Sequence, residues 1–131
     1  MRVLDASVVV DAFVIDGDPG EVARQQLEQQ RTLNAPTILK AEVLSALRSL
    51  TLRGEIAEMR GRRAIERLHR LSVTTFPIDP LMNRIWELRS TVSVYDAWYV
   101  ALAERLSVTL VTTDRRLASA NGPRCEIKVV G

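Results

Sequence analysis

The sequence predicts an α/β protein whose parallel sheet is covered by helices on both faces. Short apolar segments with strand character alternate with longer segments of helical periodicity along the whole chain, and this alternation is typical of parallel sheets. A chain of 131 residues has the size of one domain, so we expect a single domain over residues 1–131. The predicted strands are residues 2–4, 33–36, 73–76, 108–111 and 126–130, the last an edge strand.

The first part of the chain predicts two helices between its first two strands. An apolar helix runs over 8–15, and Ser7 is a suitable N-cap because its hydroxyl can accept a hydrogen bond from a free N–H of the first turn. Residues 16–20, Asp-Gly-Asp-Pro-Gly, have turn chemistry and predict a loop. A polar helix over 21–31 follows, and Pro36 ends the second strand.

Two further helices are predicted in the middle of the chain. The helix over 37–52 carries an apolar stripe with Glu42 at its margin, where an acid is poorly placed for free solvation. The helix over 55–71 is expected to turn Ile56, Met59, Ala64 (or Arg63), Ile65 and Leu68 inward. Seven arginines and three glutamates lie between residues 48 and 70. They form either a solvated helix face with ion pairs four residues apart or a phosphate-contacting rim.

The last part of the chain predicts three helices. Asp79 is expected to cap a helix that runs from Leu81 to about Ser90. A second helix opens on Asp96, continues to Leu106 and ends in a turn at Ser107, and a short helix covers 115–118.

Four acids stand at positions that a parallel sheet would bring together. Asp5 directly follows the first strand and Asp114 follows the fourth by two residues, at the sheet edge where ligands bind. Singly, Asp5 can start a turn, Asp96 can belong to a Ser93-x-x-Asp96 capping box, Asp114 can be an N-cap, and Glu42 can pair with an arginine. Jointly they would crowd, because two unit charges about 4 Å apart repel by roughly 4 kcal/mol at an effective dielectric near 20.

A divalent cation would explain such a cluster. Mg²⁺ and Mn²⁺ prefer carboxylate oxygens, whereas the single His69 and single Cys125 cannot make a zinc site. A metal held by carboxylates activates water and polarises a phosphoryl oxygen, so the pattern indicates a metal-dependent nuclease. The net charge is only +2, but 16 of the 18 basic residues are arginine, which favours a nucleic-acid partner.

Localisation is expected to be cytoplasmic. Cys125 is the only cysteine and cannot form an internal disulfide, which is compatible with a reducing compartment. No apolar run approaches the length of a membrane span, and the first residues lead directly into strand-like sequence instead of a signal peptide.

Several segments together resemble the PIN domain, and within it the VapC toxins of bacterial and archaeal toxin–antitoxin pairs. They are Asp5-Ala-Ser7 before an apolar helix, Glu42 in a helix about 40 residues in, Tyr95-Asp-Ala-x-Tyr-Val-Ala-Leu-Ala103, and Leu110-Val-Thr-x-Asp114. The resemblance covers nearly the whole chain in order, and the block from Tyr95 to Asp114 is its most specific part.

The resemblance implies a three-layer α/β/α sandwich and an Mg²⁺- or Mn²⁺-dependent endoribonuclease. Asp5, Glu42, Asp96 and Asp114 match the acidic quartet of the family, Thr112 its Thr-x-Asp polar residue, and Ser7 its small polar residue after the first Asp. Asp5, Asp96 and Asp114 are expected nearest the metal, directly or through water, and Glu42 completes the cluster or orients the attacking water. The resemblance also implies a homodimer, silenced by an antitoxin whose C-terminal segment lies across the site.

Further candidates lie near the quartet. Some family members carry a further acid just after the position of Asp114, where this chain has Arg115 and Arg116, which puts a second metal in doubt. Ser7, Arg115 and Arg116 are the candidates to bind the RNA substrate, the arginines through its backbone. The Thr112 hydroxyl is a candidate to position a water or phosphate. Asp11 is either a substitute acid or, as we expect, a helix-surface residue. Trp86 and Trp98 either stack on a base or, as we expect, pack in the core or a dimer interface.

Three alternatives belong to other functional classes. An aspartyl-phosphate phosphatase needs a second Asp two residues after the first, where this chain has Ser7. A receiver-type signalling domain needs a lysine after a late strand, and neither Lys40 nor Lys128 fits. A non-catalytic RNA- or protein-binding module on the same fold stays open, as does a housekeeping nuclease with the same acids.

Overall fold

A computed structural model describes residues 1–131 and confirms the α/β architecture. Five strands form one sheet in the order β3-β2-β1-β4-β5, and every neighbouring pair is parallel. The strands are β1 (Arg2–Leu4), β2 (Leu33–Pro36), β3 (Val73–Phe76), β4 (Thr109–Thr112) and β5 (Ile127–Val129). Because β1 lies between β2 and β4, the residue that follows it is at the centre of the sheet edge.

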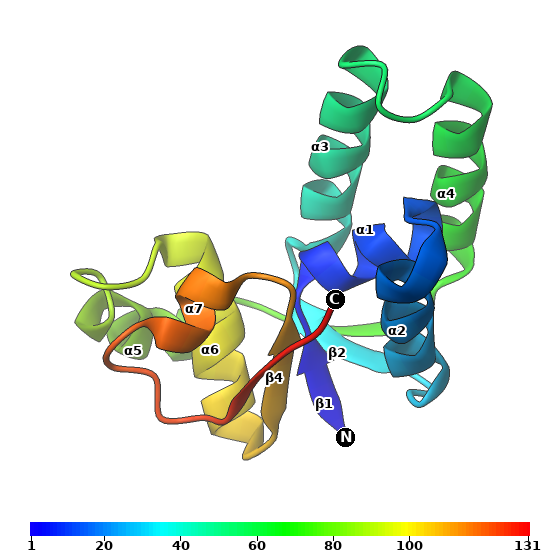
Figure 1. Ribbon diagram of the computed structural model, residues 1–131. Helices are drawn as coiled ribbons and strands as arrows, with labels where there is room; N and C mark the ends of the chain where they lie inside the picture. Colours follow the sequence, from blue (N-terminus) through cyan, green and yellow to red (C-terminus); the bar gives the residue numbers. More distant parts are fainter.

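Helices cover both faces of the sheet and complete three layers (Figure 1). They are α1 (Ala6–Val14), α2 (Gly17–Glu28), α3 (Leu39–Leu52), α4 (Glu58–Arg70), the 3₁₀ turn η1 (Asp79–Leu81), α5 (Met82–Glu87), α6 (Val94–Leu106) and α7 (Arg115–Ser119). In Figure 1, α1 to α4 lie on one side of the sheet and α5 to α7 on the other, and α3 and α4 project side by side beyond it. No helix combines the length and the apolar character needed to cross a membrane.

One apolar core runs through all three layers. Val3, Leu4, Leu110 and Val111 of the two central strands are fully buried, as expected for a parallel sheet with both faces covered. Helix α6 is buried from Ala97 to Ala103 and contacts β1, β2 and β4. Edge strand β5 is only partly buried, as its sequence predicted.

Two predictions about α1 and α2 were wrong. Asp5, not Ser7, is the N-cap of α1, because the chain turns into the helix directly after β1 and Ser7 is already in the first turn. Residues 17–20, predicted as a loop, are the first turn of α2. Pro19 is accommodated there because N–H groups of a first turn need no helical partner.

Helix α4 differs from prediction in the face that it buries. Met59 and Ile65, expected inward, are 59% and 38% exposed, whereas Gly61, Ala64 and Leu68 are buried. The close packing of α4 against α3 is the reason. A Cβ atom at Gly61 would lie 3.2 Å from Thr51 Oγ1, so a narrow stripe of mostly small residues forms the contact.

The structure corrects two predicted helix starts in the C-terminal half of the chain and confirms one predicted helix end. Asp79 is not a helix N-cap but the first residue of η1, which leads directly into α5. Helix α6 opens at Val94 instead of Asp96, because the Ser93 side chain caps it by accepting a hydrogen bond from the Asp96 N–H at 3.3 Å. Ser107 ends α6 in the left-handed conformation (φ 55°, ψ 48°), which confirms the predicted turn.

Candidate active site

The four predicted acids meet at the carboxyl edge of the sheet. Asp5 follows β1, Asp114 follows β4, Asp96 is in the first turn of α6, and Glu42 is in the first turn of α3. Asp5, Glu42 and Asp96 line one pocket of about 440 Å³. Asp96 and Asp114 line a second pocket of about 210 Å³, so Asp96 joins the two.

Asp5 is the most buried member of this acid cluster, with 8% of its surface exposed. Its Oδ2 atom accepts hydrogen bonds from Ser7 Oγ at 2.9 Å and from Thr112 Oγ1 at 2.8 Å. Burial raises the pKa of Asp5, these two hydrogen bonds and the Ala6 N–H oppose the rise, and the charge of Asp114 adds to it. The carboxylate is therefore held in position without a cationic partner.

Two hydroxyls tie the end of β1 to the end of β4. Thr112 is fully buried; it donates to Asp5 and accepts from the Asp114 N–H at 3.1 Å. Ser7 Oγ donates to Asp5 and accepts from the Thr113 N–H at 3.2 Å. Thr112 and Ser7 thus fix the acids relative to each other, and Ser7 has this role in place of the N-cap role predicted for it.

Glu42 is positioned by Tyr99, which the sequence did not single out as a functional residue. The hydroxyl of the fully buried Tyr99 donates to Glu42 Oε1 at 2.8 Å. Burial raises the pKa of Glu42, the Tyr99 hydrogen bond lowers it, and the charges of Asp5 and Asp96 raise it. No arginine pairs with Glu42, so that simpler interpretation was wrong. The available signal was a tyrosine on the apolar face of a helix, because a buried hydroxyl needs a partner.

Asp96 and Asp114 combine helix capping with membership of the cluster. Asp114 Oδ1 accepts from the Arg116 N–H at 2.9 Å, which confirms the N-cap interpretation. Burial raises the pKa of Asp96, as do the charges of Asp5 and Asp114, while Ser93 and Arg116 lower it. The cap at Ser93 uses the backbone N–H of Asp96. Capping therefore leaves carboxylate oxygens of both residues available.

The donor set fits a hard divalent cation held partly through water. Asp5 Oδ1, Glu42 Oε2 and Asp114 Oδ2 accept no hydrogen bond from a side chain, and carboxylate oxygens are the ligands that Mg²⁺ and Mn²⁺ prefer. No three Asp, Glu, His or Cys side chains converge as a direct metal cage. Mg²⁺ commonly keeps several waters and binds through one or two carboxylates, so the acid cluster matches that mode.

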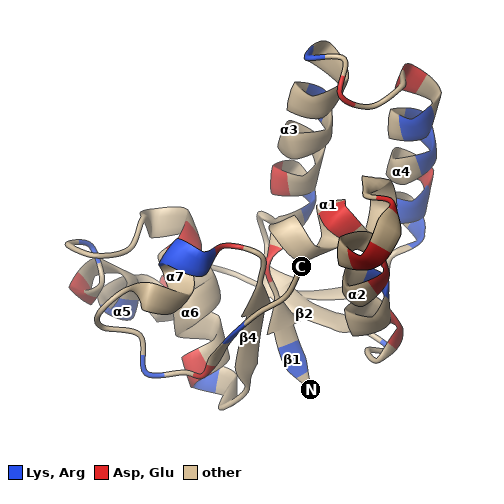
Figure 2. Cartoon of the chain, in the orientation of Figure 1, with Lys and Arg blue, Asp and Glu red and all other residues tan.

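Only some of the arginines that the sequence offered as phosphate contacts lie beside the acid cluster. Arg53 lines the pocket of Asp5, and Arg116, almost fully exposed, approaches Asp114 at 3.8 Å. Arg115 is exposed and lines neither pocket. Figure 2 shows basic residues along α4. There, Arg60 pairs with Asp16 across helices and Arg67 stacks on Phe13, and α4 contains no internal ion pair.

The structure places the three residues for which the sequence left two roles open. Asp11 is half-buried and lines the pocket of Asp5, and burial raises its pKa, so its helix-surface role stays a prediction. Trp98 is buried, which confirms packing. Trp86 is 64% exposed, and the Arg89 guanidinium lies 4.7 Å from its ring centroid.

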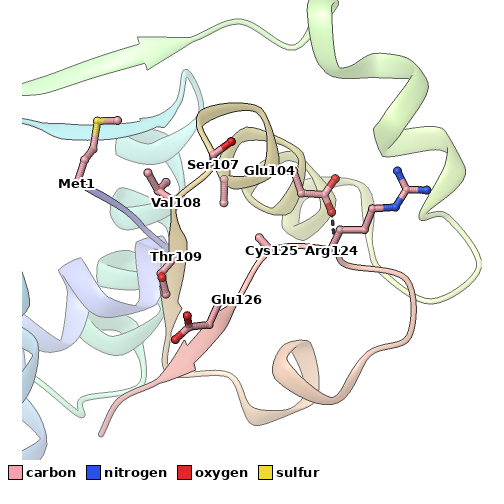
Figure 3. Close-up of a pocket in the computed structure, with 9 residues that line it drawn as sticks. Met1, Glu104, Ser107, Val108, Thr109, Arg124, Cys125 and Glu126 are labelled. Atoms are coloured by element: carbon pink, nitrogen blue, oxygen red, sulfur yellow. Dashed lines mark hydrogen bonds between the residues drawn. The ribbon is translucent and has the colours of Figure 1, made fainter.

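A larger cavity of about 840 Å³ lies at the opposite edge of the sheet (Figure 3). The Glu104 carboxylate there accepts hydrogen bonds from the Arg84 guanidinium and, at 2.7 Å, from the Arg124 N–H. Burial raises the pKa of the Cys125 thiol to about 11, so the thiol stays protonated at neutral pH. This cavity therefore has neither a free carboxylate of Glu104 nor a reactive thiol.

The comparisons with known proteins agree with this arrangement. The family model described as "PIN domain" matches residues 2–123. "Ribonuclease VapC1" of Mycobacterium tuberculosis is 46% identical over 129 residues, which cover 98% of this chain and 96% of the relative. "VapC ribonuclease Mb0985" of Mycobacterium bovis is 43% identical over 130 residues, 99% and 98% of the two chains. The crystal structure of PAE2754 from Pyrobaculum aerophilum has a TM-score of 0.72 at 21% identity and covers 98% of this chain and 83% of that one.

Proposed function

The chain belongs to the PIN-domain family, and on that premise we propose that it is an endoribonuclease that uses Mg²⁺ or Mn²⁺ and acts as the toxin of a toxin–antitoxin pair. The observation that carries this proposal is the cluster of Asp5, Glu42, Asp96 and Asp114 at the carboxyl edge of the sheet. The names of its VapC relatives support RNA as the substrate. The single apolar core supports one domain over residues 1–131.

We assign each acid a role from its surroundings. Asp5, Asp96 and Asp114 would hold the divalent ion, directly or through water. The ion, when bound, supplies positive charge that stabilises the phosphate in the transition state and makes water easier to deprotonate. Thr112 keeps Asp5 and Asp114 at a fixed separation, because its hydroxyl bonds to both residues.

Glu42 is the best candidate to accept the proton of the attacking water. Its raised pKa makes it a better base than an ordinary carboxylate. Tyr99 fixes one oxygen, Oε1, and leaves Oε2 free of side-chain donors. Arg53, Arg115 and Arg116 would contact RNA phosphates, which gives affinity and salt dependence but no choice of sequence.

RNA cleavage by the purified protein tests the proposed function. The substrate is a pool of structured cellular RNA, incubated with Mg²⁺ or Mn²⁺ and, in parallel, with EDTA. We expect discrete cuts that need the metal and that disappear in Asp96→Asn protein purified in the same way, a control against a contaminating nuclease. RNA binding without metal-dependent cleavage would replace the proposal with a non-catalytic binding module.

Removing the Tyr99 hydroxyl tests the assignment of Glu42. Tyr99→Phe preserves the ring in the core but leaves Glu42 Oε1 without its donor. We expect kcat for RNA cleavage to fall about 10- to 150-fold with little change in KM, because one hydrogen bond to a charged group contributes roughly 1.5–3 kcal/mol. Steady-state kinetics measures this. Tyr95→Phe, which removes an exposed hydroxyl, is the control, and an unchanged kcat in Tyr99→Phe would refute the role.

We propose that the antitoxin binds in the apolar groove between α3 and α4. This groove, of about 500 Å³, is lined by Leu44, Leu52 and Ile65, with Arg48, Arg62 and a single acid, Glu58, beside them. These leucine and isoleucine side chains are substantially exposed. An amphipathic segment with acidic residues at its margins would complement the groove.

Growth rescue tests this docking site. Expression of the chain is expected to arrest growth, and co-expression of its antitoxin to restore it. The double variant Leu44→Glu/Ile65→Glu should arrest growth despite the antitoxin, because two charges would be buried at the interface. Met59→Glu changes an exposed α4 residue outside the groove and should still be rescued. Rescue of both variants would place the antitoxin elsewhere.

We also propose that the chain forms a homodimer through α5. Met82 and Trp86, four residues apart on one face of this helix, are 54% and 64% exposed. Apolar exposure of this kind is typical of a protein interface. Sedimentation velocity over a range of concentrations should give a dimer that Trp86→Ala weakens, and a monomer at all concentrations would rule it out.

A further inference from the structure

A groove of about 480 Å³ runs beside the acid cluster along α3 and has no assigned role. It is lined on α3 by Ala41, Glu42, Ser45, Ala46 and Ser49, and its other wall includes Tyr95. Three of these residues, Glu42, Ala46 and Ser49, also line the pocket of Asp5 and Asp96. The groove therefore continues directly from the acid cluster.

The chemistry of this groove suits a flat, uncharged group. The α3 residues other than Glu42 are alanine and serine, and Ile38, directly before α3, adds an apolar wall. No lysine or arginine lines it, and Glu42 is its one ionisable group besides Tyr95. A phosphate would thus meet a negative charge without a compensating cation, whereas a nucleobase carries no charge.

Tyr95 and two serines supply the contacts that a base needs. Tyr95 is 56% exposed and directly precedes Asp96 in the chain. Unpaired RNA bases stack on such aromatic rings, and their edges bind polar side chains. The hydroxyls of Ser45 and Ser49 have no hydrogen-bond partner within the chain and can pair with a base edge.

We propose that this groove is a nucleobase subsite in which an unpaired base of the RNA stacks on Tyr95. The inference rests on the proposed ribonuclease function. Because the groove shares Glu42 with the acid cluster, the bound base belongs to a nucleotide adjacent to the cleaved phosphodiester. Tyr95 therefore contributes to the choice of the cleavage site.

The test uses a short RNA hairpin, chosen because the wild-type protein cleaves its loop, with the full-length chain and Mg²⁺. Tyr95→Ala is expected to raise KM about 10-fold, in line with the loss of one stacked base, with a smaller change in kcat. Tyr95→Phe retains the ring and should retain the wild-type KM. Met59→Ala, which removes an exposed apolar side chain on α4 away from this groove, is the control for KM.

Two further measurements separate the competing explanations. Ser45→Leu fills the groove from an exposed position and should raise KM as Tyr95→Ala does, at an unchanged melting temperature. Mn²⁺ affinity, measured by calorimetry, should be the same in both variants and in the wild type, which excludes an effect on the metal.

The outcomes distinguish failure of the subsite from failure of the proposed function. If the wild-type protein cleaves no RNA, the ribonuclease function itself fails. If it cleaves, but Tyr95→Ala keeps the wild-type KM and cleavage sites, the subsite is refuted. If Tyr95→Ala instead dissociates an oligomer in sedimentation velocity, the groove is an interface with a second copy of the chain, which also overturns the proposal.

Discussion

Asp5→Asn is expected to lower RNA cleavage at least about 100-fold while the fold is preserved. Asp5 is the centre of the acid cluster, since its charge raises the pKa of both Glu42 and Asp96. Asparagine has the same shape, and its amide oxygen can accept the hydrogen bonds of Ser7 and Thr112. It lacks the charge that would help to hold a divalent ion, so electrostatic stabilisation of the transition state is lost.

The same substitution should stabilise the metal-free protein at neutral pH. Burial raises the pKa of Asp5 in the folded protein above its value in the unfolded chain. Its contribution to stability is therefore complete below the ordinary carboxyl pKa, and it is lost as the pH rises through the raised pKa. The wild-type protein should lose this stability as the pH rises above the ordinary carboxyl pKa, and Asp5→Asn should not.

Urea denaturation in EDTA at pH 4 and pH 7.5 measures the free energy of unfolding of both proteins. The difference between Asp5→Asn and the wild type should be larger at pH 7.5. Added Mn²⁺ should raise the melting temperature of the wild type more than that of the variant, because a ligand of the folded state stabilises it. Undiminished cleavage by Asp5→Asn, or lower stability at pH 7.5, would contradict the electrostatic account of the cluster.

Thr112→Val should impair both stability and cleavage. Valine has nearly the shape of threonine, but it deprives Asp5 of a donor and the Asp114 N–H of an acceptor. Because Thr112 is fully buried, we expect a loss of about 2–3 kcal/mol in the free energy of unfolding. Cleavage should fall about 10- to 100-fold, since small displacements of catalytic groups are costly.

Thr112→Ser is the matched control, because it restores the hydroxyl and removes only a methyl group. It should recover most of the cleavage rate that Thr112→Val loses. Steady-state kinetics at saturating Mg²⁺ and urea denaturation of the two variants provide the comparison. Equal activity of the two variants would show that the hydroxyl of Thr112 does not organise the acids.

The sequence alone was sufficient to predict the order of the elements and the parallel sheet. Apolar strand segments and helical periodicity can be recognised in the local sequence, because the apolar residues that define them are the residues that the core buries. Asp5 and Asp114 follow buried strands, so their meeting at one edge is a consequence of the parallel topology. Asp96 at a helix start and Glu42 at the margin of an apolar stripe were also candidates from the sequence, the family resemblance agreed with both, and the structure brings both to the same edge.

Local predictions failed where the choice of packing partner decides the outcome. Met59 and Ile65 have apolar side chains at helical spacing, yet α4 turns Gly61 and Ala64 toward its neighbours. Arg60 could pair along its own helix but binds Asp16 of the α1–α2 connection. The apolar periodicity of a helix predicts that one of its faces is buried. It does not predict how closely the partner helix approaches, which decides the residues that form the contact.

The tertiary structure alone decided how the acids are supported. The hydrogen bond from Tyr99 to Glu42 spans 57 residues of sequence, and that from Thr112 to Asp5 spans 107. No local pattern specifies such pairs, because they depend on the distance between α3 and α6 and between β1 and β4 after the core has packed. The residues of the acid cluster could thus be identified from the sequence, whereas their fixed positions, and the groove beside Tyr95, follow from long-range packing.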